Sequence, residues 1–245
     1  MIAPPTANNR GSANLQYPIE TPPARNGMSP NLVVSYNSDV SDGWLGEGWD
    51  IQIPSITVDT RWGVPRYDSQ YETETYLLNG EMLCTPNEAG EMTVAHRGEL
   101  INRGNSDRQF YTRLGGDFSK IIRKGDSPSN YYWEVTDKNG TIYTYGEQSN
   151  GGAVIGCLQD TATKVISEWK LTSVKEVHDD FIKYYYTQDT ETAIGGISTI
   201  AVYLESIEMG YGFNNENTQI DVSGKKVLIV DDNALNIKVA TRLLK

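Results

Sequence analysis

The sequence predicts an all-β protein, a multi-hairpin antiparallel module built as a sandwich or an irregular barrel. Short runs of alternating apolar and polar residues, the pattern of half-buried strands, recur along most of the chain. Asn-Gly pairs, which favour tight hairpin turns, separate several of these runs. Tyrosine contributes 15 of the 245 residues, and a tyrosine-rich sequence poor in helix formers favours strands.

Length and charge limit the function classes. A chain of 245 residues can form one large β domain or two smaller ones, with a proper core. The net charge of -11 argues against nucleic-acid binding, which needs a basic surface. No apolar run approaches the roughly 20 residues of a membrane span. Residues 1–10 have neither a charged nor an apolar leader region, so we expect no Sec signal peptide.

The first part of the chain reads as a lead-in followed by strands. Residues 1–30 hold six of the ten prolines and should be extended, with a first short strand at 14–19. Residues 31–37 alternate and predict a half-buried strand. Residues 43–68 hold three of the five tryptophans and four glycines around an alternating run from Ile51 to Val58. We interpret this stretch as a Gly-Trp corner that feeds a strand, a packing device in which large rings cover a tightly turned backbone.

Hairpins follow. Residues 71–78 and 81–84 flank Asn79-Gly80, the strongest short hairpin signal in the chain. Residues 85–130 are more polar, with weak strands expected at 91–95, 110–114 and 118–123.

The second half alternates more clearly. We predict one hairpin from 131–136 and 141–145 around an Asn-Gly turn within 137–140. A longer hairpin should pair 165–177 with 181–187 around a turn at 178–180, and a long strand should span 197–209.

The Gly-Trp corner also carries a family resemblance. Gly43-Trp-Leu-Gly-Glu-Gly-Trp49, followed by Arg61-Trp-Gly-Val-Pro-Arg-Tyr-Asp68, is similar to the start of the SpvB family. That family comprises the N-terminal domain of the Salmonella virulence plasmid 65 kDa protein and of the B components of insecticidal Tc toxin complexes. Residues 11–38 and Leu77-Leu-Asn-Gly-Glu81 fit the same pattern, and the resemblance extends more loosely to residue 221. The hairpins that begin at Trp133 and Trp169 are similar to RHS/YD-type hairpins.

The resemblance implies a non-catalytic structural module of a secreted toxin, within residues 1–221. It would help build the β shell that carries or encapsulates a separate toxic effector domain. The implied partners are other toxin-complex subunits or the rest of a larger toxin chain, with no nucleic acid, no membrane span and no cofactor. We predict the framework of this module to be Gly43, Trp44, Gly46, Gly48, Trp49, Arg61, Trp62, Gly63, Pro65, Arg66 and Asp68.

The C-terminal residues 222–245 differ in composition. Five Lys/Arg and two Asp give them a net charge of +3, against -14 for the first 221 residues. An apolar strand ending in Asp231-Asp232 and an amphipathic helix pattern from 234 to 245 resemble the first strand and helix of a response-regulator receiver domain. In that family the matching acids help to bind Mg²⁺. The chain stops before the phospho-accepting Asp, so we expect no signalling and no metal, since Mg²⁺ would need a complete receiver domain. The tail is then a fusion fragment, a truncated receiver, or an addition that folds against the β domain.

Other candidate sites have simpler readings. Glu72-Thr-Glu74 matches the Glu-x-Glu pair of ADP-ribosyltransferases, but the upstream Arg and Ser-Thr-Ser-like strand are missing, so we expect a solvated strand face. His96 and His178 lie in different segments, and Asp179-Asp180 reads as turn acids rather than a cation site. The glycines of the corner lack the Rossmann spacing.

Two alternatives stay open at this point. The chain could be a glycan- or protein-binding β module in which Tyr184–Tyr186 form a glycan platform, although alternating tyrosines more often pack across strands. The tail could also belong to a two-component protein. Cys84 and Cys157 fit no zinc spacing and should be reduced and structural, with a disulfide between them as the alternative.

Overall fold

The chain is described by a computed structural model at residues 6–7, 11–21, 28–40, 42–87, 90–94, 101–114, 119–149, 151–192 and 198–210. All regular elements in these ranges are strands, which confirms the all-β prediction. None of these residues belongs to a helix long and apolar enough to cross a membrane.

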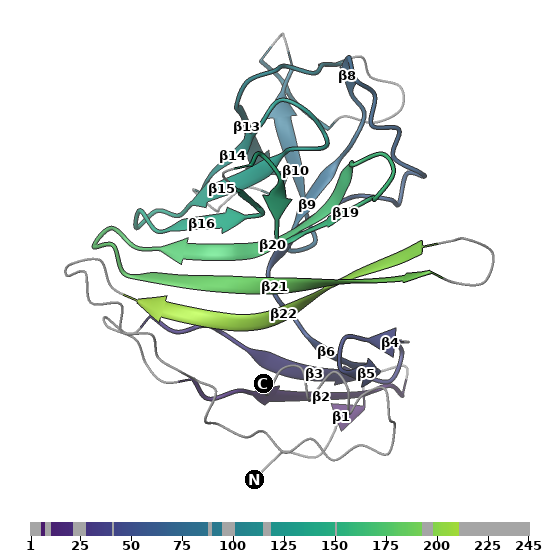
Figure 1. Ribbon diagram of the computed structural model, residues 1–245, viewed down its shortest axis with the longest axis vertical. Coiled ribbons are helices and arrows are strands. Elements are labelled where there is room, and N and C mark those ends of the chain that lie inside the picture. Colours follow the sequence, from purple (N-terminus) through teal and green to yellow (C-terminus); the bar gives the residue numbers. More distant parts are fainter. Residues whose placement is uncertain are drawn as a thin grey trace.

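Eight antiparallel strands close into a barrel, drawn in the upper part of Figure 1. β20 closes it, because residues 168–170 pair with β7 while residues 171–175 pair with β16. Closure leaves the barrel without the free edges at which other chains could pair. In the order of pairing, the strands are β16 (Ile142–Tyr145), β15 (Tyr132–Thr136), β14 (Lys120–Lys124), β13 (Arg108–Thr112), β10 (Glu81–Pro86), β9 (Tyr76–Leu78), β7 (Ser55–Val58) and β20 (Ile166–Lys175).

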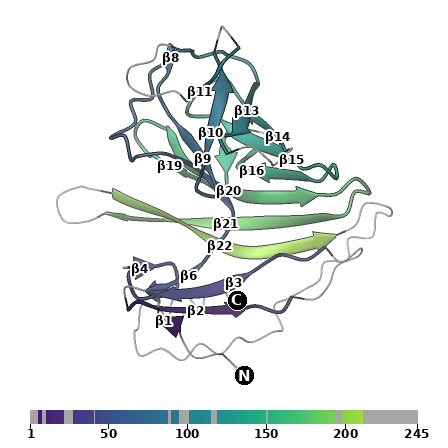
Figure 2. The same ribbon diagram turned by 180° about the vertical axis from the view of Figure 1, so that it is seen from behind.

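A long two-stranded ribbon continues from the barrel. β21 (Phe181–Thr192) pairs with the end of β20, and β22 (Ser198–Gly210) pairs with β21 over its whole length. Figures 1 and 2 show this ribbon crossing the molecule between the barrel and a second sheet. Two short strands, β11 (Met92–Thr93) and β19 (Cys157–Gln159), extend the barrel sheet beside β10 and β20.

The second sheet is formed by the N-terminal part of the chain. Its six strands follow the order β1-β2-β3-β6-β5-β4, and residues 52–54 connect it to β7 of the barrel. Its strands are β1 (Thr6–Ala7), β2 (Ala13–Pro18), β3 (Val33–Asn37), β4 (Asp42–Gly43), β5 (Gly46–Glu47) and β6 (Trp49–Ile51). Two isolated pairs complete the fold: β8 (Tyr71–Glu72) with β12 (Ile101–Asn102), and β17 (Glu147–Gln148) with β18 (Val154–Ile155).

The hairpin predictions are confirmed, with one difference in turn type. Asn79 and Gly80 both have positive φ, +49° and +87°, so they form the expected two-residue turn between β9 and β10. In the second hairpin only Gly140 is left-handed, at +86°, and the Asp137 N–H donates to the Thr141 carbonyl at 3.0 Å. This loop therefore has three residues, because the Asp137 side chain accepts the Asn139 and Thr141 N–H groups and holds a wider turn.

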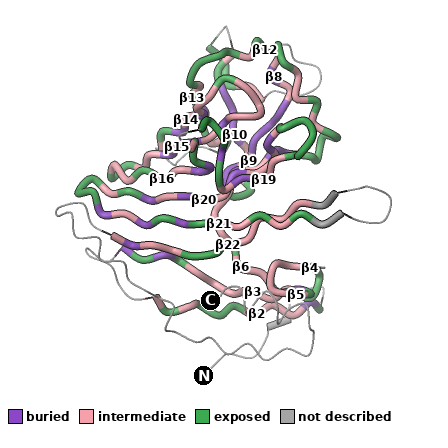
Figure 3. Tube along the Cα trace, in the orientation of Figure 1, coloured by how far each residue is buried: buried purple, intermediate pink, exposed green. Residues whose placement is uncertain are grey.

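Aromatic rings fill the barrel. Trp133 and Trp169 are fully buried, and Tyr76 packs edge-on against Trp133 with ring centroids 4.9 Å apart. Phe110 contacts Trp133 at 5.1 Å. Figure 3 shows the buried residues concentrated in the barrel and the ribbon, whereas the N-terminal sheet is mostly half-buried or exposed.

Several predictions change in detail. The single strand expected at 71–78 is divided into β8 and β9, because residues 73–75 turn inward between them. The lead-in at 1–30 contributes strands β1 and β2 to the second sheet. The predicted boundary at 221 and the receiver-like residues 222–245, with Asp231 and Asp232, lie outside the described residues.

Candidate functional site

The glycines of the Gly-Trp corner are required by close backbone packing. The corner is formed by β4, β5 and β6, and Gly46 and Gly48 have φ of +126° and +74°. A Cβ on Gly48 would lie 2.6 Å from the Tyr36 ring, and a Cβ on Gly43 would overlap the Trp49 carbonyl oxygen. Larger residues therefore cannot replace these glycines without moving the backbone.

The tryptophans of the motif are more exposed than a packing role predicts. Trp44 is half-buried and stacks on Tyr203 with centroids 6.2 Å apart. Trp49 is 36% exposed, although it contacts the Tyr36 ring at 5.0 Å, and Trp62 is 62% exposed. The expectation that these rings cover the backbone is wrong for Trp62 and only partly met by Trp49.

The second half of the motif forms a loop between β7 and β8. The Asp59 carboxylate accepts two hydrogen bonds from the Arg61 guanidinium, at 2.9 and 2.8 Å. Gly63 has φ of +110°, while Pro65 is half-buried and Arg66 is exposed. The motif therefore forms a structured surface loop at this point.

Asp68 ends the loop. Its carboxylate accepts the N–H groups of Gln70 and Tyr71, both at 2.8 Å, and these bonds lower its pKa. The Asp68 carbonyl accepts from the Arg103 Nε at 2.8 Å. Asp68 thus connects the surface loop to the charged groups inside the barrel.

Those groups form a buried ionic cluster of Glu72, Glu74, Arg103 and Arg123, whose side chains are all at most 3% exposed. Arg123 donates to both carboxylate oxygens of Glu72, at 2.9 and 2.5 Å. Arg103 pairs with Glu74 at 2.5 Å and with Glu72 at 3.4 Å. The expectation of a solvated Glu-Thr-Glu face is wrong, because the chain turns both acids toward the arginines.

Aromatic side chains enclose the cluster. The Arg123 guanidinium carbon lies 3.9 Å from the centroid of the Tyr131 ring, and its Nη1 donates to the Tyr76 hydroxyl at 3.2 Å. Burial acts to raise the pKa of Glu72, but the hydrogen bonds and charge of Arg123, with the charges of Arg103 and Arg108, outweigh it and lower that pKa. Both cluster acids are thus engaged by arginines, so they are poorly placed to orient a substrate.

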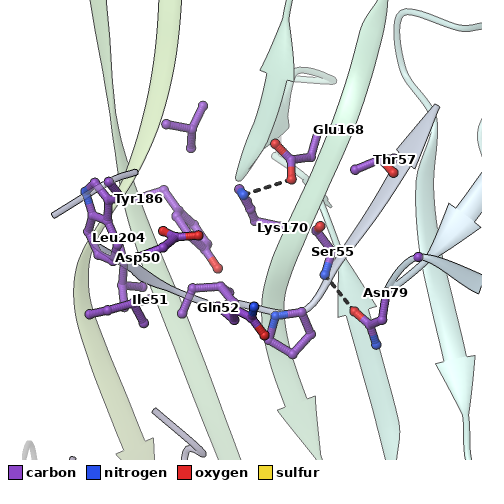
Figure 4. Close-up of a pocket in the computed structure, with 15 residues that line it drawn as sticks. Asp50, Ile51, Gln52, Ser55, Thr57, Asn79, Glu168, Lys170, Tyr186 and Leu204 are labelled. Atoms are coloured by element: carbon purple, nitrogen blue, oxygen red, sulfur yellow. Dashed lines mark hydrogen bonds and ion pairs between the residues drawn. The ribbon is translucent and has the colours of Figure 1, made fainter. Parts of the chain in front are cut away.

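An interlayer groove of about 520 Å³ lies where the N-terminal sheet, the ribbon and the barrel meet. Figure 4 shows Asp50, Gln52, Tyr186, Glu168 and Lys170 around it, with Lys170 paired to Glu168 at 2.8 Å. The groove is lined by two acids, two amides, a lysine and aromatic rings, and among these residues the ion pair with Glu168 holds Lys170 in its charged form, which is not a nucleophile.

The remaining predicted sites are not brought together. His178 is exposed in a hairpin turn, and His96 lies outside the described residues. Asp179 pairs with Lys175 at 2.6 Å, and Asp180 is buried. Among the residues that the structure describes, no cluster of three or more His, Cys, Asp and Glu could hold a metal ion.

The cysteines and tyrosines behave as packing residues. Cys84 and Cys157 are buried free thiols, as predicted, and burial raises the pKa of Cys157 to about 12. Tyr184 is buried, and the half-buried Tyr186 donates its hydroxyl to the Leu171 carbonyl. Tyr185 alone faces outward, where it bonds Glu208 at 2.6 Å, so the three rings do not form one platform.

Two residues of the ionic cluster escape prediction from the sequence. Arg103 and Arg123 lie 20 residues apart in segments of ordinary polarity. The sequence offers one signal, at Arg123. Arg123 lies two residues after Ile121, so both side chains point to the same face of the strand. If that face is buried, the arginine needs a buried partner of opposite charge. The partner acids come from a distant segment. The pairing of β12 with β8 brings Arg103 to them, and the fold of the barrel brings Arg123.

Comparisons with known proteins agree with this fold. The family described as "Salmonella virulence plasmid 65kDa B protein", SpvB, matches residues 7–207. No protein among the curated sequences matches.

Three solved structures illustrate the shared fold. TcdB2-TccC3 is 21% identical with a TM-score of 0.63, and the match covers 91% of this chain and 11% of that one. The N-terminal domain of effector protein SpvB from Salmonella typhimurium strain LT2 is 20% identical with a TM-score of 0.56, and the match covers 76% of this chain and 60% of that one. The Photorhabdus luminescens Tc holotoxin pore is 21% identical with a TM-score of 0.57, and the match covers 85% of this chain and 9% of that one.

The chain thus spans about a tenth of the Tc proteins that it matches and 60% of the SpvB structure. Because the family match extends over most of the sequence, the chain belongs to the SpvB family.

Proposed function

We propose that the chain is a non-catalytic structural module of a secreted bacterial toxin. It contributes part of a β wall that carries or encloses a separate effector region. Membership of the SpvB family and the fold shared with TcdB2-TccC3 support a place in such a toxin. Its partners would be the rest of a larger toxin chain or other subunits of a toxin complex.

The filled barrel is the observation that carries the structural role. Its interior holds packed aromatic rings and the buried ionic cluster, so it has no room for a substrate. The cluster acids are paired with arginines, and closure removes the sheet edges of the barrel. Such a unit resists deformation, which suits a wall, and it offers no activated nucleophile.

A chimera of TcdB2-TccC3 tests the proposal. Residues 7–207 of this chain replace the matched segment, and the purified chimera is digested with trypsin beside the parent protein. We expect a digestion half-life close to that of the parent, because the inserted module should complete the same wall. Rapid digestion of the TcdB2-TccC3 part, or failure of the chimera to assemble while this chain folds alone, would contradict the proposal.

A further inference from the structure

The loop from Thr60 to Tyr67, here called the Trp62 loop, presents apolar side chains to solvent. Trp62 is 62% exposed and Val64 is 79% exposed, and they lie on either side of Gly63. Arg61 and Arg66 flank them and are also exposed. Exposed large apolar side chains that gather at one place mark interaction sites more often than isolated ones do.

Asp59 holds the first half of this loop in one conformation. Its side chain is almost fully buried, and its carboxylate accepts the backbone N–H of Arg61 at 3.0 Å in addition to the guanidinium. The hydrogen bond from the Arg61 side chain is the main cause of its lowered pKa, and the Trp62 side chain also hydrogen-bonds to it. The Thr60 carbonyl accepts the Gly63 N–H at 3.0 Å, which closes a turn. A single carboxylate therefore orients both the arginine and the indole.

The second half of the loop is anchored to the barrel. Tyr67 packs against the hydrophobic core, and burial is the main cause that raises its pKa to about 12. Asp68 follows at once and is tied to the buried ionic cluster through Arg103. With both ends fixed, the exposed tip does not need to be ordered on binding, and this lowers the entropic cost of association.

The composition of the tip is that of a binding hot spot. Tryptophan and arginine are the residues most often found where a few side chains supply most of an interface's binding energy. Asp59 compensates the charge of Arg61, so the positive charge that this loop adds comes from the exposed Arg66, on a module whose first 221 residues carry a net charge of -14. A fitting surface has an apolar pocket for the indole and acidic residues at its rim.

We propose that the Trp62 loop docks this module onto the remaining wall of the toxin shell. The inference rests on the proposed function. The chain covers only 11% of TcdB2-TccC3, so most of such a protein lies outside it and can supply the facing surface. The loop is thus an interaction element of the family motif, and its tryptophan acts at an interface.

The TcdB2-TccC3 chimera provides the test. The variant Trp62→Ser with Val64→Ser is made in the chimera and in the 245-residue chain. Leu114→Ser is the matched control, because Leu114 is 86% exposed at a different place. We expect the loop variant to be digested by trypsin at least about tenfold faster than the parent chimera, while the melting temperature of the isolated chain is unchanged. Leu114→Ser should match the parent in both measurements.

The outcomes separate the two proposals. If the parent chimera is itself unstable, the proposed function fails. If the parent chimera is stable and the loop variant is equally resistant, the docking proposal fails and the proposed function stands. Binding of the isolated chain to phosphatidylglycerol vesicles, abolished by the same variant, would assign the loop to a membrane surface and overturn the docking proposal. Arg66→Glu gives an independent check, because it should accelerate digestion of the chimera more at low salt than at high salt.

Discussion

The barrel and the N-terminal sheet differ in what stabilises them. The barrel buries Trp133 and Trp169 completely and encloses a paired ionic cluster. The N-terminal sheet contains the most conspicuous sequence motif, yet its residues are mostly half-buried, and Trp49 lies near the surface. A dense motif therefore does not mark the core here. Its glycines are needed where neighbouring atoms leave no room for a Cβ, while the core is built by strands with an ordinary alternating pattern.

The largest expected difference concerns the tryptophans. Trp133→Ala should reduce the free energy of unfolding by about 3–5 kcal/mol, because it opens a cavity in the aromatic core. Trp49→Ala should reduce it by only about 1–2 kcal/mol, since Trp49 is already 36% exposed and buries less apolar surface than Trp133. Urea denaturation of both variants measures the contrast. Equal losses would mean that the N-terminal sheet is as tightly packed as the barrel.

The ionic cluster provides the second contrast. Arg123→Met should cost about 3 kcal/mol of stability, because it deprives Glu72 of its two shortest hydrogen bonds in a buried place. The double variant Arg123→Met with Glu72→Leu should recover much of this loss, since it also removes the buried carboxylate that would keep only its longer contacts with Arg103 and Arg108, both at 3.4 Å. A double variant no more stable than the single one would show that the pair contributes more than mutual neutralisation.

Acid sensitivity should follow the same cluster. The folded-state pKa of Glu72 is lowered, so its contribution to stability is complete above the unfolded value of about 4.3 and disappears as the pH falls through the lower folded value. The free energy of unfolding should therefore decrease as the pH falls below about 4.3. The Arg123→Met/Glu72→Leu variant should show a flatter profile in this range. Identical profiles would remove Glu72 as a source of acid sensitivity.

Two glycine variants distinguish the cost of steric crowding from the cost of an unfavourable backbone conformation. Gly48→Ala should cost about 1–3 kcal/mol, because the new Cβ combines a positive φ with contact against Tyr36. Gly80→Ala is the matched control, with φ of +87° and no atom within 4 Å of the added Cβ, and should cost about 1 kcal/mol. Thermal unfolding of the two variants compares them. A loss for Gly48→Ala no larger than that for Gly80→Ala would mean that the backbone of the corner shifts readily to accommodate the added methyl group.

Removal of residues 222–245 should have the smallest effect. We expect the shortened chain to melt at the same temperature as the full chain, since the tail resembles part of a different domain. Digestion of the full chain with trypsin should leave a resistant product of about 220 residues, measured by mass spectrometry. A tail that survives digestion together with the core would contradict the boundary at 221.

The sequence allows most of the fold to be predicted. Alternation and turn residues locate the hairpins at Asn79-Gly80, at 137–140 and at 178–180, and these pairings depend only on neighbouring residues. Barrel closure depends on the pairing of β20 with both β7 and β16, which are distant in sequence. No local pattern specifies such long-range pairing.

The candidate site is less predictable for the same reason. The Gly-Trp motif is visible in the sequence, but the exposure of each tryptophan depends on which other strands pack against it. The sequence therefore could not show that Trp62 lies on the surface. Glu72 and Glu74 read as surface acids because alternation alone does not reveal their partners. Arg103 reaches them through the long-range pairing of β12 with β8, and Arg123 reaches them through the fold of the barrel.

Hydrogen-exchange mass spectrometry of the 245-residue chain tests most directly whether the barrel is the rigid framework of the module. We predict that amides in β14, β15 and β20 exchange only through global unfolding, whereas those in β2 and β3 exchange at least about tenfold faster through local opening. Equal protection of the two regions would contradict the account, because the N-terminal sheet would then be part of one uniformly stable core.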